Sequence, residues 1–269
     1  MKKKSFFGKL GSEIGLPAIV ILVALLVSIF AFNFVFGDPS HFQGNDNANQ
    51  PLAGNYFGII YKGGFIVPIL MTLNMVVLTF CVERYFALKK AKGKGSIVKF
   101  IQEIREKIMY GDIKSALEAC DKQKGSVANV VYSTLKKYEE VEKETNMAKD
   151  QKLVAIQKEV EEATTLELPA MEQNLVILAT ISSVSTLMGL LGTVLGMIRA
   201  FAALANAGAP DSVALAAGIS EALVNTALGI GTAAIAIIAY NYFTTKIDKL
   251  TYAIDEAGFS IVQTYSAKH

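Results

Sequence analysis

The sequence predicts an all-α membrane protein with four transmembrane helices and a cytoplasmic helical region. Hydrophobic residues make up 52% of the 269-residue chain, whereas charged residues make up only 19%. The charge is unevenly distributed, since long stretches contain none and a central block holds most of it. A helix that crosses a bilayer needs about 20 mostly apolar residues, and four stretches of this chain provide them.

The four expected spans cover residues 16–36, 64–86, 173–205 and 212–245. Because the last two exceed the length that a bilayer requires, we expect them to tilt or to extend into water. A turn at residues 206–211, which contains Gly208 and Pro210, joins them into a hairpin.

Lysine and arginine residues near the span ends predict the orientation of the chain. They gather before the first span, after the second and after the fourth, at Lys2, Lys3, Lys4, Lys9, Arg84, Lys89, Lys90, Lys92, Lys94, Lys246 and Lys249. The connector 37–63 contains only Lys62, and the turn contains neither Lys nor Arg. Residues 1–15, 87–172 and 246–269 are therefore expected in the cytoplasm, with both termini there. The connector and the turn are expected on the periplasmic side.

The first span shares one feature with a secretory signal peptide, because a basic segment precedes it. Its apolar region is long for a signal peptide, and no A-x-A cleavage site follows it. We therefore expect an uncleaved membrane anchor, with cleavage as the alternative.

Histidine and cysteine are too sparse to predict a metal site. The connector 37–63 is rich in Gly, Asn, Asp and Pro, so we expect an irregular loop around a lone His41. His269 is the C-terminal residue, Cys81 lies in an apolar stretch and Cys120 in a charged one. No metal or other cofactor is expected, and the net charge of +2 gives no indication of a nucleic-acid partner.

The block 87–172 is expected to be helical. Helical spacing relates Ile97, Ile101, Ile104 and Ile108. A helix stop and restart is expected at Gly111 and Asp112. The run 136–167 mixes both charge signs at short spacing, as a solvated helix face does, and a partner-binding coiled coil is the alternative. Pro169 predicts the start or a kink of the third membrane helix.

The third and fourth spans each carry a stripe of small and polar residues. At about 100° per residue, the stripe of the third span consists of Ser182, Ser185, Gly189, Gly192, Thr193, Gly196, Ala200 and Ala203. Gly192 and Gly196 form a GxxxG pair, and such residues let helices approach closely in lipid. One side of the fourth span carries Gly218, Glu221, Asn225, Gly229, Thr232, Ala236 and Ala239. The opposite side carries Leu223, Ile230 and Ile237.

Glu221 is the only carboxylate in these two spans. A charge at bilayer depth costs at least about 2.5–3.5 kcal/mol, so such residues usually face a cavity and mark an ion path. Folding the hairpin about residue 208 places Thr193 level with about residue 224, in one layer with Glu221, Asn225 and Thr226. Polar groups at one depth indicate a wet, selective constriction. We therefore predict a proton pathway at these residues, with Glu221 and Thr226 flanking it.

Arg199 provides a competing interpretation. The same folding places it level with about residue 218, one helical turn from Glu221. An ion pair between Arg199 and Glu221 would be structural and would keep the carboxylate charged. Arg199 could instead extend to the outer headgroups. The predicted pathway depends on a Glu221 carboxyl without a permanent cationic partner.

These residues resemble the MotA/TolQ/ExbB proton-channel family, and its ExbB members most closely. The resemblance covers about residues 64–250 and rests on GLLGTVLGM (189–197), GISEALVNTALG (218–229), YNYF (240–243) and the E-R-x-F-x-L-K-K turn (83–90). By match to these motifs, Thr193, Glu221 and Thr226 correspond to the polar pore residues of the family. Three features depart from the pattern: the first span is extra, Asn225 replaces a small apolar residue, and Arg199 is not expected.

The resemblance implies a function and a set of partners. In this family the long helical hairpin lines a pore in a pentamer, around a single-span ExbD-like protein whose membrane Asp takes part in proton transfer. It implies a multi-pass protein of the bacterial inner membrane. Such a protein uses the proton-motive force to do work on a TonB-like protein and so energises transport across the outer membrane. A TolQ-like role in envelope maintenance is the alternative.

Other classes of function fit the sequence less well. No GxxxxGK[ST] nucleotide loop occurs, and the glycines of the motifs at 189–197 and 218–229 lie in membrane helices, so we do not expect an enzyme. A secondary transporter would show inverted repeats and broken helices, and the sequence has neither. A non-conducting scaffold that recruits partners through residues 87–172 remains an alternative, but it leaves the polar layer unexplained.

Overall fold

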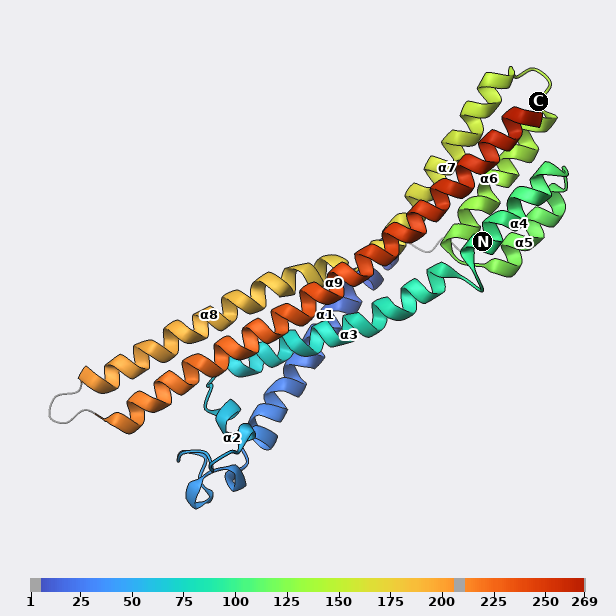
Figure 1. Cartoon of the computed structure of the whole chain (residues 1–269). Coiled ribbons are helices and arrows are strands. Elements are labelled where there is room, and N and C mark those ends of the chain that lie inside the picture. The colour runs from blue at the N-terminus through green and yellow to red at the C-terminus, as the bar shows by residue number, and fades with distance from the viewer. Residues whose placement is uncertain (1–5, 206–210, 269) are drawn as a thin grey trace. The chain divides into compact units, whose positions relative to one another are not determined.

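The structure is a computed structural model that describes residues 6–205 and 211–268. These residues are almost entirely helical (Figure 1), and the one strand-like contact among them joins Phe42 to Pro51. The helices are α1 Phe6–Phe30, α2 Tyr56–Tyr61, α3 Ile66–Lys92, α4 Ile97–Met109, α5 Ile113–Gln123, α6 Ser126–Lys143, α7 Lys149–Glu172, α8 Leu175–Ala205 and α9 Ser212–Lys268. The predicted all-α fold is confirmed.

Four helical stretches of the described chain are long and apolar enough to cross a membrane, as predicted. They are Pro17–Phe36, Ile66–Met109, Leu175–Ala205 and Ser212–Lys268, with mean hydropathies between 1.9 and 2.9. The first includes a π-helical turn, Ala31–Phe36, that follows α1. Of the expected turn at 206–211, residues 206–210 lie outside the described residues, as do residues 1–5 and His269.

The chain divides into two compact units. Unit 1 consists of Met1–Cys81 and Val176–Tyr240, and unit 2 consists of Val82–Leu175 and Asn241–His269. Helices α3 and α9 therefore contribute residues to both units.

In unit 1, α8 and α9 pack with their backbones in contact. A Cβ atom on Gly196 would lie 2.7 Å from both the Ala222 nitrogen and the Gly218 oxygen. A Cβ atom on Gly229 would lie 2.6 Å from the Ser185 oxygen. Side chains cannot fit at such distances, so the predicted close packing through small residues is confirmed. The residues predicted on the opposite face of α9 are exposed, namely Leu223, Ile230 and Ile237.

The extra first helix packs against α3 within unit 1. Ala24 and Ser28 are buried, and the Ser28 hydroxyl lies 3.4 Å from the Met75 sulfur. Large apolar side chains elsewhere on this helix are exposed, including those of Ile19, Leu22, Val23 and Leu26. Such a surface suits contact with lipid.

The connector 37–63 is more ordered than the expected irregular loop. The Asn55 side chain caps α2 by accepting a hydrogen bond from the Gly58 nitrogen at 3.2 Å. The Phe42 ring is buried and packs edge-on against Tyr61, with 5.5 Å between ring centroids. The apolar aromatic residues of the connector give it a small core of its own, which its polar composition did not indicate.

Unit 2 is a helical bundle built from α4 to α7 and the last part of α9. The isoleucines expected on one helix face are buried at Ile101, Ile104 and Ile108. The predicted stop and restart occurs at Gly111, whose φ is +76°, and at Asp112. The Asp112 carboxylate accepts a hydrogen bond from the Ser115 nitrogen at 3.0 Å and so caps α5. The prediction is confirmed.

The mixed-charge run 136–167 forms the end of α6 and most of α7, which pack side by side (Figure 1). Its charged side chains make exposed pairs along each helix, such as Lys143 with Glu139 at 3.0 Å. Tyr138 and Ile156 of this run are buried, whereas Val154 and Leu166 are exposed. The predicted solvated helix face is therefore present.

Residues 246–268 continue α9, which runs for 57 residues. The Tyr265 ring packs edge-on against Tyr138, with 4.8 Å between ring centroids. The Lys149 Nζ donates a hydrogen bond to the Ser266 oxygen at 2.9 Å. A helical signal was present in the sequence, since apolar residues recur at the spacing of one helix face and are all buried, at Ile247, Leu250, Ile254, Ala257, Ile261 and Tyr265.

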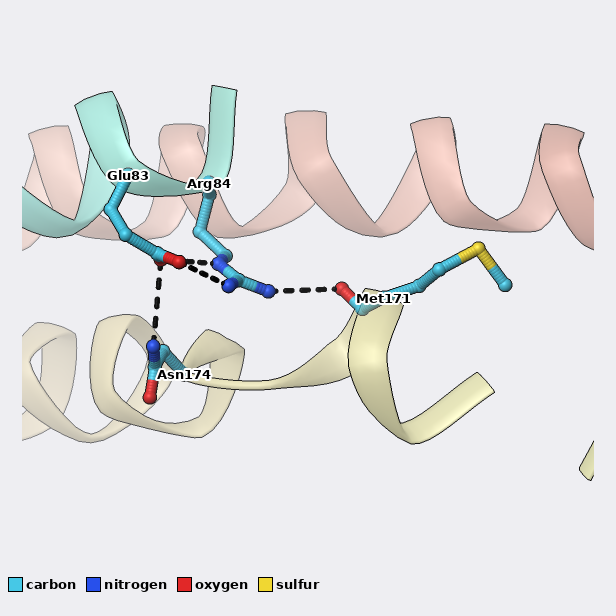
Figure 2. Close-up of polar contacts among 4 residues, drawn as sticks. All are labelled: Glu83, Arg84, Met171 and Asn174. Carbon is cyan, nitrogen blue, oxygen red and sulfur yellow. Dashed lines mark hydrogen bonds and ion pairs between the residues drawn. The ribbon is translucent and has the colours of Figure 1, made fainter. Parts of the chain in front are cut away.

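The sequence predicted that Pro169 begins or kinks the third membrane helix. This prediction is wrong, because Pro169 lies near the end of α7 and the third membrane helix, α8, begins at Leu175. The chain breaks at Asn174, whose φ is +64°, and the buried Arg84 side chain lies at this break (Figure 2). Its Nη1 donates to the Met171 oxygen at 3.2 Å, and its Nε donates to Glu83 Oε2 at 2.5 Å. The guanidinium is thereby neutralised and also satisfies a carbonyl at the end of α7.

The close contact of α8 and α9 predicts opposite effects for two glycine substitutions. Gly196→Ala should lower stability by about 1–3 kcal/mol, because its Cβ would collide with the α9 backbone. Gly231→Ala is the matched control, since a Cβ there has no atom within 4 Å, and it should raise stability by up to about 1 kcal/mol. Thermal unfolding in detergent, followed by circular dichroism, measures both. Equal effects of the two substitutions would contradict the packing.

Burial predicts an unreactive thiol in unit 2. Removal from water raises the pKa of the Cys120 thiol to about 12, and only the thiolate is a nucleophile. Iodoacetamide should therefore modify Cys120 in the unfolded chain and not in the folded chain, as measured by mass spectrometry of its peptide. An unfolded thiol ionises near about pH 8.5, so a rise in pH from there towards 12 should favour unfolding. Rapid labelling of the folded protein would show that this thiol is not buried.

Candidate functional site

The candidate site lies in unit 1, where α8, α9 and the residues before α3 meet. The hydroxyls of Thr193 on α8 and Thr226 on α9 hydrogen-bond to each other. Each also lies near a carbonyl of its own helix, at 3.2 Å from the Gly189 oxygen for Thr193 and 3.1 Å from the Ala222 oxygen for Thr226. A hydroxyl both donates and accepts, so the hydrogen bond between the helices can point in either direction.

The predicted register of the hairpin is close to the observed one. Thr193, expected level with about residue 224, contacts Thr226. Gly192 packs directly against the Asn225 side chain, which occupies the space that a side chain at Gly192 would need. The structure therefore brings Thr193, Asn225 and Thr226 together, with Glu221 about one turn away along α9.

Glu221 is buried and ion-paired. The Nη1 of Arg199 lies 2.5 Å from Glu221 Oε1 and 2.7 Å from Oε2. The sequence left this pair open as an alternative, and the structure contains it. The expectation of a Glu221 carboxyl without a cationic partner is therefore wrong, because burying an unpaired carboxylate costs far more than turning a nearby arginine towards it.

The two partners of the ion pair differ in their exposure. The Glu221 side chain is 7% exposed, whereas that of Arg199 is 52% exposed. A single guanidinium nitrogen contacts both carboxylate oxygens, so the pair lacks the two-nitrogen fork of the strongest arginine–carboxylate contacts. The Arg199 Cζ also lies 6.0 Å from the centre of the Phe65 ring. The carboxylate is thus fixed inside the protein, and the arginine covers it from the outside.

The residues before α3 complete the site, and they were not among the residues predicted from the sequence. Asn225 Nδ2 donates a hydrogen bond to the Gly63 oxygen at 2.8 Å. Gly64 has a φ of +76°, and a Cβ there would lie 2.6 Å from Glu221 Oε1. Only glycine fits this position, both for its backbone and for its distance from the carboxylate. The adjacent pair Gly63–Gly64 at the start of a span was the available signal.

Asn225 contains an unsatisfied acceptor. Its side chain is fully buried, and its Oδ1 has no hydrogen-bond partner among the described residues. A buried amide oxygen without a partner is unfavourable, so this polar atom is retained at a cost in stability.

The remaining candidate ligands lie apart from this site. No group of three His, Cys, Asp or Glu residues in the described chain could hold a metal ion. His41 Nε2 lies 3.1 Å from the Val35 oxygen in the π-helical turn, and its Nδ1 lies 3.0 Å from Asn55 Nδ2 in the connector. Cys81 and Cys120 are both free thiols.

Comparison with known proteins gives one family match. The model of the MotA/TolQ/ExbB proton channel family matches residues 122–256, which include Thr193, Arg199, Glu221 and Thr226.

Individual relatives are similar over parts of the chain. A protein of Methanothermobacter thermautotrophicus, named as a homolog of biopolymer transport protein ExbB, is 28% identical over 72% of this chain and 66% of its own length. Tol-Pal system protein TolQ of Haemophilus influenzae is 39% identical over 33% of this chain and 39% of its own length. Biopolymer transport protein ExbB of Salmonella typhimurium is 40% identical over 26% of this chain and 29% of its own length. This chain therefore spans less than two thirds of the length of each of these relatives.

The ion pair predicts that removing one partner is worse than removing both. Arg199→Gln should lower stability by about 2 kcal/mol, because it leaves the buried Glu221 carboxylate unpaired. The double variant R199Q/E221Q should recover most of this loss, and Arg105→Gln, on an exposed position of α4, is the control. Thermal unfolding in detergent compares the four proteins. A double variant that is no more stable than Arg199→Gln would contradict the prediction.

Proposed function

Because this chain belongs to the MotA/TolQ/ExbB proton channel family, we propose that it is the proton-channel subunit of an inner-membrane motor that energises TonB-dependent outer-membrane transport. A proton channel moves an ion and makes no covalent bond, so the chain is not an enzyme. It is a multi-pass membrane protein with four candidate spans. The proton-motive force is the source of energy in this proposal.

The observation that supports this function best is the hydroxyl contact between α8 and α9. Thr193 and Thr226 form a hydrogen bond inside a hairpin that is otherwise apolar on its outer faces. Two hydroxyls that can each donate and accept provide a route for a proton where a methyl group would provide none. In this proposal they line the pathway, and Asn225 keeps the layer polar.

Glu221 acts in this proposal as a gate that Arg199 holds closed. The carboxylate is buried while the arginine is half exposed, so the arginine can move away and the carboxylate cannot. Once unpaired, a buried carboxylate is strongly disfavoured, so in this proposal Glu221 takes part in proton transfer only while Arg199 is turned away. Return of Arg199 restores the ion pair and closes the gate. The pair is then a switch between two states and not a permanent structural contact.

The proposed partners would cover apolar surface that a single chain leaves exposed. Large apolar side chains on the outer face of α8 are exposed, including Leu187, Leu190, Leu191, Val194, Ile198 and Phe201. Other copies of the chain and the lipid bilayer would cover such faces, and a pentamer is the proposed assembly. A single-span ExbD-like protein with a membrane Asp would lie in its pore, and that Asp would compete with Glu221 for Arg199. A TonB-like protein would receive the work.

The proposed location is the bacterial inner membrane, with both termini in the cytoplasm. The lysines after the second and fourth spans support this orientation, since cytoplasmic segments carry the excess of positive charge. Unit 2 would then lie in the cytoplasm.

Two alternative functions are each supported by one specific observation. Similarity to Tol-Pal system protein TolQ favours a role in envelope maintenance. The Arg199–Glu221 ion pair favours a non-conducting scaffold, because a permanent pair would take no part in proton transfer.

The hydroxyl pathway predicts that Thr193→Val and Thr226→Val each lower proton flux at least about tenfold, since valine keeps the shape of threonine and removes its hydroxyl. The control is Thr180→Val, whose exposed hydroxyl donates to the Val176 oxygen of its own helix. Flux is measured with a pH-sensitive dye in vesicles that contain the assembled complex. Unchanged flux in both threonine variants would refute the hydroxyl pathway.

The gate predicts that Glu221→Gln and the double variant R199Q/E221Q both stop energised uptake while the complex still assembles. Growth on siderophore-bound iron, in a strain that lacks the native gene, reads out the ExbB-like role. Sensitivity of the same strains to detergent reads out the TolQ-like role. Wild-type growth and wild-type detergent resistance of the double variant would leave only the scaffold.

A further inference from the structure

Unit 2 contains a basic groove that the proposed proton pathway does not use. It has a volume of about 460 Å³ and lies between the end of α3, the start of α4 and the part of α9 that follows Asn241. Four lysines line it, namely Lys89, Lys92, Lys246 and Lys249, and no aspartate or glutamate does. We call this feature the lysine groove.

The four lysines are not neutralised by the described part of the chain. None of them forms an ion pair with a described carboxylate. Lys246 Nζ lies 5.3 Å from the centre of the Tyr242 ring, within the range of a cation–π interaction. Four ammonium groups around one groove repel one another, so an anion in the groove would remove an unfavourable interaction.

The floor of the lysine groove is apolar. Leu88, Phe243 and Leu250 line it and are buried. Tyr85 and Tyr242 also line it and are about half exposed, so each ring presents an apolar body and a polar hydroxyl. A free phosphate ion would gain nothing from this floor, whereas a molecule with both a phosphate and a hydrocarbon part would satisfy both halves of the groove.

The lysine groove lies on helix segments that directly follow apolar stretches. On α3 the uncharged stretch ends just before Glu83, six residues before Lys89. On α9 the first lysine after the start of the helix is Lys246. Lysines in this position along a spanning helix lie at the level of the lipid headgroups, where basic pockets bind anionic lipids.

We propose that the lysine groove binds one anionic phospholipid of the phosphatidylglycerol type. The lysine ammonium groups contact its phosphate, and the upper part of an acyl chain lies on the floor formed by Leu88, Phe243 and Leu250. Zwitterionic lipids fit poorly, because their own ammonium or choline group would add a positive charge to the groove. The bound lipid would screen the lysines and so stabilise the arrangement of α3 and α9 in unit 2.

Native mass spectrometry of the detergent-purified complex tests this proposal. Phosphatidylglycerol is added in steps, and phosphatidylcholine with the same acyl chains is added to a parallel sample. We expect phosphatidylglycerol adducts that survive gas-phase activation and phosphatidylcholine adducts that do not. In the variant K89Q/K246Q the apparent affinity for phosphatidylglycerol should fall at least about tenfold.

The matched control is K90Q/K94Q, which removes two lysines from the same segment that do not line the groove and should bind phosphatidylglycerol as the wild type does. If the wild-type protein retains phosphatidylglycerol and phosphatidylcholine equally after activation, the proposal is overturned whatever the variants show. An equal loss of affinity for phosphatidylglycerol in both variants would show that net charge, and not the groove, determines binding, and would overturn the proposal. Displacement of the lipid by excess inorganic phosphate would assign the groove to free phosphate, and displacement by an acidic peptide alone would assign it to a protein partner.

Discussion

The site depends on the backbone contact between α8 and α9. Glycines at the crossing, among them Gly196 and Gly229, bring the helices so close that a Cβ atom on either would collide with the facing backbone. In lipid, close packing and polar contacts replace the hydrophobic force that holds helices together in water. The same closeness lets two short threonine side chains, Thr193 and Thr226, reach each other. Packing and polarity at this site therefore have one structural cause.

Burying charge imposes a second constraint, and the chain meets it in the same way in each unit. In unit 1 the buried Glu221 is paired with Arg199, and Gly64 leaves room for the carboxylate. In unit 2 the buried Arg84 is paired with Glu83 at the break between α7 and α8. A buried charge without a partner would cost several kcal/mol, so each is accompanied by its opposite. The two pairs differ in exposure: the Arg84 side chain is enclosed, whereas the Arg199 side chain is half exposed.

Helix α9 carries the residues of both proposed sites. Its first part supplies Glu221, Asn225 and Thr226 to unit 1, and its later part supplies Lys246 and Lys249 to the lysine groove of unit 2. The two sites use different chemistry, since one buries a polar layer between helices and the other presents cations beside an apolar floor. A proton pathway and a lipid site can therefore be separated by substitution, although a single helix contributes to each.

The sequence by itself determined the properties that belong to one segment at a time. Four spans, the small-residue faces of α8 and α9, and the break at Gly111 follow from composition and helical periodicity, which need no knowledge of the neighbours. Only the tertiary structure decided that Arg199 pairs with Glu221, that Gly63 and Gly64 approach α9, and that the last turns of α9 pack in unit 2. The physical reason is that such contacts depend on the reach of side chains between segments far apart in the chain. From the sequence, Glu221 could be either unpaired or paired with Arg199. The distance between the two side chains decides between these possibilities, and only the tertiary structure gives that distance.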